Sequence, residues 1–137
     1  MLQKLAAAWC LMAACVVIHA AGIASVIRSH YTDAPMARSF GVWTWLFVRV
    51  AGWMILLHMI EISLWAALYE WAGAMPDLTS ALYFSAVTYT TTGYGDLVLP
   101  DTWRLVGGIE ALTGILMCGL STGFFFAVLS RMFPTRA

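Results

Sequence analysis

Three long apolar runs, at residues 5–27, 45–69 and 105–129, limit what this chain can fold into more than any other feature. Backbone polar groups that face lipid must be hydrogen-bonded to one another, so a chain crosses a bilayer as helices or as a closed barrel. At 1.5 Å per residue, each run is long enough to cross a hydrocarbon core of about 30 Å as a helix. We therefore expect an all-α membrane protein that crosses the bilayer several times.

The overall composition agrees with this class. The chain is 62% hydrophobic and 10% charged, whereas soluble domains average about 25% charged residues. Its formal net charge is zero, which indicates no nucleic-acid partner. Cys10, Cys15 and Cys118 lie inside the apolar runs without metal-ligand spacing, and we predict that they are small packing residues.

Between the second and third runs lies a short polar stretch, Thr90-Thr91-Thr92-Gly93-Tyr94-Gly95-Asp96. Glycine adopts positive φ at little cost, so the alternation of Gly93 and Gly95 with bulkier residues permits a backbone that other residues resist. Successive carbonyls can then point the same way, and a row of carbonyl oxygens can replace the water shell of a cation. One chain supplies one wall of such a ring, so several copies must meet on an axis. The alternative is a glycine-rich surface turn.

The segment Thr91-Thr92-Gly93-Tyr94-Gly95 resembles the selectivity filter of potassium channels, in which four TVGYG loops present carbonyls to the ion. Four of the five positions match, and Thr92 replaces a valine with a residue of similar shape that adds a hydroxyl. The flanking Thr90 and Asp96 also fit the family. The resemblance implies passive, selective conduction of K⁺, with K⁺ bound at Thr91, Thr92, Gly93 and Tyr94. Beyond the permeant ion, no cofactor is implied.

The resemblance covers about residues 45–131 and implies a tetrameric pore-loop architecture. The run at 45–69 becomes the outer helix, residues 79–90 a re-entrant pore helix that leads into the filter, and the run at 105–129 the inner helix. We therefore expect two parts, an N-terminal transmembrane helix with a cytoplasmic interfacial connection at 1–44 and a pore domain at 45–137. The implied partners are K⁺ ions, the lipid bilayer and three further copies of the chain.

Several residues near the filter are predicted to support it. The aromatic pair that often stands beside the filter in this family is represented by Tyr83 and Phe84, whereas the usual pore-helix acid is replaced by Val87. Two acids lie inside the apolar runs, Glu61 and Glu110, and a charged acid at that depth costs about 2.5–3.5 kcal/mol. We expect Glu110, or with less preference Glu61 beside His58, to give polar support to the pore helix. The alternative is a hydrogen bond between helices without effect on conduction.

The third run is predicted to line the cavity and the gate. Gly114 matches the hinge glycine of the inner helix in two-span potassium channels. Carrying the helical phase forward places the following residues towards the axis: Ile115, Cys118, Thr122 and Phe126. Phe126 would narrow the cytoplasmic end and gate by dewetting. The competing prediction is that the phenylalanines at 124–126 meet lipid.

The distribution of lysine and arginine predicts the orientation, because these residues favour the cytoplasmic side. The middle connection and the C-terminal tail carry five of the seven: Arg28, Arg38, Arg49, Arg131 and Arg136. Lys4 and Arg104 fall on the other side, so the filter opens outward and the N-terminus lies outside. Together with the resemblance, this predicts a multi-pass plasma-membrane protein of the bacterial inner-membrane type.

Two segments allow more than one prediction. Residues 5–18 after Lys4, with a cut near Ala20 or Ala21, also fit a signal peptide. Residues 28–44 fit a short helix on the membrane surface, as the family implies, or an ordinary loop.

A different function must be weighed against the channel. Gly119-Leu120-Ser121-Thr122-Gly123 fits the G-x-S-x-G nucleophile pattern, and His58 with Glu61 could act as base and orienting acid of an intramembrane serine hydrolase. That pattern belongs on a strand-to-helix turn, whereas here it lies inside an apolar helix, so we do not expect an enzyme. The sequence is also compatible with a weakly selective cation channel and with a non-conducting subunit of another channel.

Overall fold

The structure, a computed structural model, describes the backbone of residues 1–30 and 40–132 and the side chains of residues 1–28 and 40–130. Within these residues it consists of helices without strands: α1 (Leu2–His30), α2 (Phe40–Trp71), α3 (Leu78–Tyr89), the short 3₁₀ turn η1 (Asp101–Trp103) and α4 (Arg104–Met132). The expected all-α membrane architecture is confirmed, because three of these helices are long and apolar enough to cross a bilayer.

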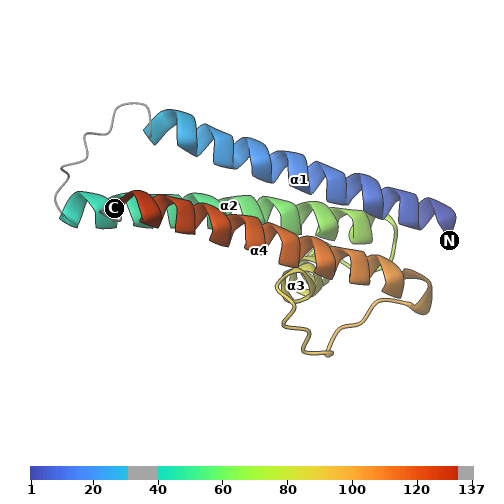
Figure 1. Cartoon of the computed structure of the whole chain (residues 1–137). Coiled ribbons are helices and arrows are strands. Elements are labelled where there is room, and N and C mark those ends of the chain that lie inside the picture. Colours follow the sequence, from blue (N-terminus) through green and yellow to red (C-terminus); the bar gives the residue numbers. More distant parts are fainter. Residues whose placement is uncertain (31–39, 133–137) are drawn as a thin grey trace.

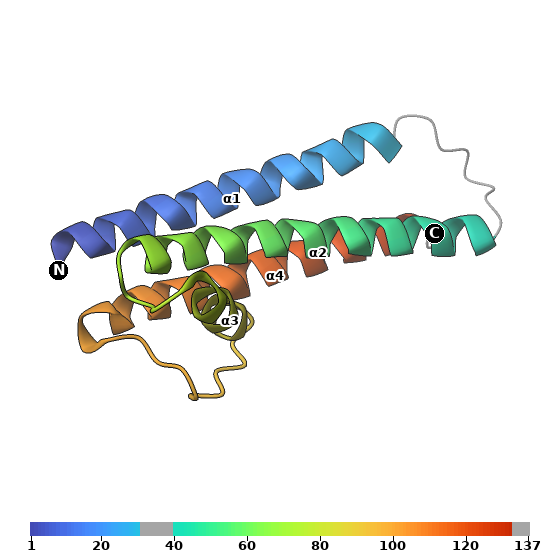
Figure 2. The same cartoon turned by 180° about the vertical axis from the view of Figure 1, so that it is seen from behind.

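The three long helices lie side by side, with α1 running along α2 and α4 (Figures 1 and 2). α2 begins at Phe40, five residues before the predicted start of the second span. The reason is local, since Phe40 to Thr44 contain no proline and continue the apolar helix. Phe40, Val42 and Trp43 therefore belong to the first turn of α2 and not to a separate surface helix. The rest of that predicted surface segment lies outside the described residues.

The short helix α3 carries the signals that define both its ends. Asp77 lies in the extended region at the N-cap, and its carboxylate accepts hydrogen bonds from Ser80 N (2.8 Å) and Ser80 Oγ (3.0 Å). The same bonds lower the pKa of Asp77. At twelve residues, α3 is too short to cross a membrane. Figure 1 shows it nearly end-on below α2 and α4, so it crosses the long helices steeply.

A buried aromatic cluster holds α3 against the long helices. Tyr69 of α2 contacts Phe84 of α3 and Trp103 of η1 edge to face, with ring centroids 5.5 Å and 6.1 Å apart. Ala8 and Cys15 of α1 belong to the same core. Towards the other end of the bundle, a second cluster joins Val26, Leu46, Val50, Met54 and Leu57.

One contact places the start of α1 beside the start of α4. Lys4 Nζ donates to Thr102 Oγ1 (2.9 Å) and lies 4.5 Å from the centre of the Trp103 ring. The first turn of α1, the loop after α3 and the start of α4 thus lie at the same end of the molecule. The last turns of α1 and the first turns of α2 lie at the opposite end (Figure 2).

Candidate functional site

The segment that follows α3 has an alternating backbone. Thr91, Gly93 and Gly95 have φ angles of +59°, +53° and +77°, whereas the intervening Thr92 and Tyr94 are not among the positive-φ residues. Positive φ is costly for a β-branched residue such as Thr91, so the surrounding bonds must hold it there. Thr91 N donates to Thr88 O (2.9 Å) and Gly93 N donates to Val87 O (3.0 Å), which fixes the turn onto the end of α3.

Side chains on either side of this segment are hydrogen-bonded to it or to α3. Thr90 Oγ1 donates to Ala86 O (2.7 Å) and lies 3.0 Å from Thr92 Oγ1. Tyr83 Oη of α3 donates to Asp96 Oδ2 (2.7 Å), which lowers the pKa of that carboxyl group. The segment from Thr90 to Asp96 is exposed in the single chain.

The residues predicted to line a cavity fall on one open face of α4. Ile115, Cys118, Thr122 and Phe126 are all solvent-accessible in the single chain, and Phe126 is 70% exposed. Gly114 differs, because it is buried where α4 crosses the end of α3. A Cβ at Gly114 would lie 2.7 Å from the carbonyl carbon of Tyr89 and closer still to its oxygen. The structure therefore gives Gly114 a packing role beside α3, and its role as a hinge stays a prediction.

The two buried acids contact different helices. Both Glu61 and Glu110 are 0% exposed. Glu110 Oε2 accepts a hydrogen bond from Tyr69 Oη of α2 (2.8 Å). Glu61 Oε2 instead accepts a bond from Tyr89 Oη, the last residue of α3. The hydroxyl at the end of the short helix thus reaches Glu61, the acid that the sequence analysis ranked second.

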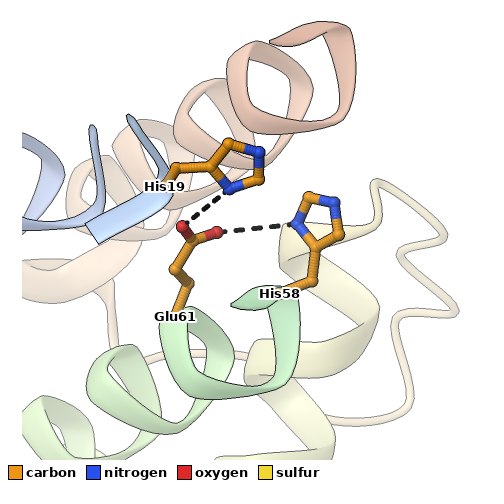
Figure 3. A group of neighbouring side chains, drawn as sticks. All are labelled: His19, His58 and Glu61. Carbon is orange, nitrogen blue, oxygen red and sulfur yellow. Dashed lines mark hydrogen bonds and ion pairs between the residues drawn. The ribbon is translucent and has the colours of Figure 1, made fainter. Parts of the chain in front are cut away.

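Glu61 lies at the centre of a polar cluster to which α1, α2, α3 and α4 all contribute a side chain. Figure 3 shows His19, His58 and Glu61 of this cluster. His19 Nδ1 of α1 lies 3.0 Å from Glu61 Oε1, and His58 Nδ1 lies 3.5 Å from Glu61 Oε2. The Nε2 atoms of the two rings lie 3.0 Å and 3.1 Å from Ser121 Oγ of α4. The sequence analysis assigned no functional role to His19. The available signal was three ionisable residues within apolar runs, which usually mark function.

These contacts also bear on the hydrolase alternative. Ser121, His58 and Glu61 do come together as that alternative requires. Ser121, however, is buried inside α4, where the backbone N–H groups of its neighbours serve the helix and form no oxyanion hole. The arrangement lacks the strained turn that exposes such a nucleophile.

Comparison with known proteins connects the segment and its flanking helices to one family. The sequence model described as "Ion channel" matches residues 43–131, which is well over half of the chain. A curated relative, the potassium voltage-gated channel protein Shal of Drosophila melanogaster, is 36% identical over 59 residues. That match covers 42% of this chain and 10% of the relative, so the chain spans a small part of the relative's length. No solved structure matches the chain.

Proposed function

The chain belongs to the ion channel family, as its resemblance to potassium-channel pore domains predicted, and from this premise we propose that it conducts K⁺ selectively. In this proposal four copies place the segment Thr91–Gly95 around a common axis. The carbonyl oxygens of Thr91, Thr92, Gly93 and Tyr94 then replace the hydration shell of the ion.

The alternation of φ from Thr91 to Gly95 is the observation that carries the proposal. A regular strand keeps φ negative throughout and points successive carbonyls to opposite sides. Changing the sign of φ at every second residue turns successive carbonyls towards one side. A segment that concentrates its carbonyl oxygens in this way is suited to binding a desolvated cation.

The position of this segment adds an electrostatic argument. It begins at the C-terminal end of α3, where the helix dipole places partial negative charge. Four such ends around an axis would favour a cation in the space below the filter. On the proposed outer side, acids lie at the chain's loops and helix ends, at Glu70, Asp77, Asp96 and Asp101, and their field would concentrate cations near the entrance.

The exposed surfaces of the single chain support assembly into a tetramer. A ring of carbonyls needs several copies, and the filter segment is exposed in one chain. α4 exposes large apolar side chains, among them Ile115 (55%), Leu116 (57%) and Phe126 (70%), which must meet lipid or another copy. In the tetramer, Ile115, Cys118 and Thr122 would line the cavity, with Phe126 narrowing its inner end.

Thr92, which stands where the family has a valine, is the feature that favours the alternative of a weakly selective cation channel. In this chain the Thr92 hydroxyl lies 3.0 Å from the Thr90 hydroxyl, so it has a partner beside the filter. The added group is therefore held by its neighbour and need not enter the ion path, which favours the selective channel. Asp96 and Tyr83 would brace the outer end of the segment through their 2.7 Å hydrogen bond.

We expect the purified full-length chain to have the mass of four protomers by native mass spectrometry and to carry K⁺ into liposomes down its gradient. Protein-free liposomes are the control. The expected orientation is that of a plasma-membrane protein with the filter outward. A monomeric or dimeric mass, or tetramers that pass no K⁺, would overturn the proposal and favour a subunit that conducts only with a partner.

A further inference from the structure

The polar cluster around Glu61 carries an inference that does not depend on conduction. Its three possible metal-ligand side chains are His19, His58 and Glu61, whose ligand atoms all lie within 4.8 Å of one another. Figure 3 shows the two rings next to each other, each with its Nδ1 atom directed at one oxygen of the carboxylate. His19 and Glu61 are fully buried, and the His58 side chain is 19% exposed.

With both imidazoles neutral and Glu61 ionised, the hydrogen-bonding contacts of the cluster require one proton more than its groups carry. Five contacts need a proton each, namely His19 to Glu61, His19 to Ser121, His58 to Ser121, His58 to Tyr89, and Tyr89 to Glu61. Two neutral imidazoles, one serine hydroxyl and one tyrosine hydroxyl supply four, because an ionised carboxylate has none. One of the five contacts therefore has no proton, so that two lone pairs face each other there, and burying such a contact is costly.

A divalent metal ion removes this deficit. With the ion on His19 Nδ1, His58 Nδ1 and a Glu61 oxygen, each ring carries its proton on Nε2. Both Nε2–H groups then donate to Ser121 Oγ, at 3.0 Å and 3.1 Å. The Ser121 hydroxyl, now an acceptor of two bonds, keeps its own proton for Met54 Sδ at 3.7 Å. A histidine ligand whose second nitrogen donates to an outer acceptor is the usual arrangement at metal sites.

We propose that His19, His58 and Glu61 bind one Zn²⁺ ion per chain. Two imidazole nitrogens and one carboxylate oxygen suit Zn²⁺ and other late first-row divalent ions, whereas Mg²⁺ and Ca²⁺ prefer oxygen ligands alone. The hydroxyl of Tyr89 lies 3.2 Å from His58 Nδ1 and offers an oxygen as a fourth ligand. The carboxylate also offsets part of the charge that the ion brings to this depth.

Bound there, the ion would join α1 to α2 directly beside the end of α3. Tyr89 is the last residue of α3 and also hydrogen-bonds to Glu61, two residues before the positive-φ Thr91. The site therefore couples the N-terminal helix, which the family match does not include, to the segment that the match does include.

The test is equilibrium binding of Zn²⁺ to the chelator-treated full-length chain in detergent. We expect one Zn²⁺ per chain, with neither Mg²⁺ nor Ca²⁺ competing. Co²⁺ in the same site should show the visible absorption of a low-coordinate nitrogen and oxygen environment, without a thiolate charge-transfer band. A thiolate band would overturn the ligand assignment, since it would place Cys15 or Cys118 on the metal.

Variants separate the proposed site from a purely structural cluster. The substitutions His19→Gln, His58→Gln and Glu61→Gln keep hydrogen-bonding groups and should each weaken Zn²⁺ binding by more than about 100-fold. Ser121→Ala removes an outer partner and should weaken it by about 10–100-fold. His30→Gln is the matched control, because His30 is eleven residues further along α1, or about 16 Å, and should bind as the original chain does.

Two results would overturn the proposal. One is absence of Zn²⁺ binding by the original chain in a preparation whose helix content by circular dichroism is intact. In that case one additional proton, on Glu61 or on one of the two imidazoles, satisfies the cluster. The other is binding that survives His19→Gln and Glu61→Gln unchanged, which would place the ion elsewhere.

Discussion

Replacing Gly95 with alanine is expected to abolish K⁺ selectivity in the reconstituted protein. Gly95 has φ of +77°, where a Cβ costs roughly 1–2 kcal/mol per chain, and the proposed tetramer carries four copies. No neighbouring atom lies within 4 Å of the added Cβ, so the cost comes from the backbone and not from a clash. The backbone can relieve it by moving φ to negative values, which would turn a carbonyl away from the axis. The measurement is the ratio of K⁺ to Na⁺ flux into liposomes.

The matched control for this change is Gly52→Ala. Gly52 lies within α2, has no positive φ and also has open space for a Cβ. The same atoms are added there without backbone strain, so flux and selectivity should be unchanged. A Gly95→Ala protein that keeps the original K⁺ to Na⁺ ratio would show that residues 91–95 are not the filter.

Gly114→Ala is expected to destabilise the assembled protein and to reduce conduction with it. The new Cβ would meet the carbonyl group of Tyr89 at 2.7 Å or less, and a backbone carbonyl cannot rotate out of the way. Overpacking of this kind typically costs about 1–3 kcal/mol, occasionally more. Here relief requires α4 to move away from the end of α3, which carries the proposed filter. The first measurement is the melting temperature of the detergent-solubilised tetramer, and the second is K⁺ flux into liposomes.

Gly119→Ala provides the comparison within the same helix. Gly119 is exposed, and a Cβ there meets nothing within 4 Å. The two substitutions change helix propensity equally, so a difference in melting temperature isolates the contact with Tyr89. If Gly114 acts only as a hinge, the Gly114→Ala and Gly119→Ala proteins should have the same melting temperature and should differ only in how often the channel opens. Equal melting temperatures would therefore contradict the packing role.

The helices of this protein were predictable because each depends on a local property. Apolar runs of membrane length predicted α1, α2 and α4, and α3 begins at Leu78, one residue before the predicted start of the pore helix. The predicted start of α2 at residue 45 was wrong, because α2 begins at Phe40. The segment from residue 40 to residue 44 contains no proline, and the change from polar to apolar residues there was taken for the start of the helix. The glycine alternation likewise predicted positive φ at Gly93 and Gly95, although not at Thr91.

The cluster around Glu61 could not be predicted in the same way. Depth along the membrane, judged by position in the sequence, placed Glu61 and Glu110 equally well beside α3. The rotation of α2 and α4 about their axes decides which acid meets Tyr89, and that rotation depends on packing between helices. The convergence of His19 and Ser121 on the same point depends in addition on how α1 docks, which no local pattern in its sequence specifies.

The central claim is that residues 91–95 form a filter that selects K⁺ over Na⁺. Its most direct test is the reversal potential of the reconstituted protein in a planar bilayer, with K⁺ on one side and an equal concentration of Na⁺ on the other. The account predicts a reversal potential displaced strongly in the direction that K⁺ permeation sets. A reversal potential near zero would mean equal permeability to the two ions, and it would contradict the claim.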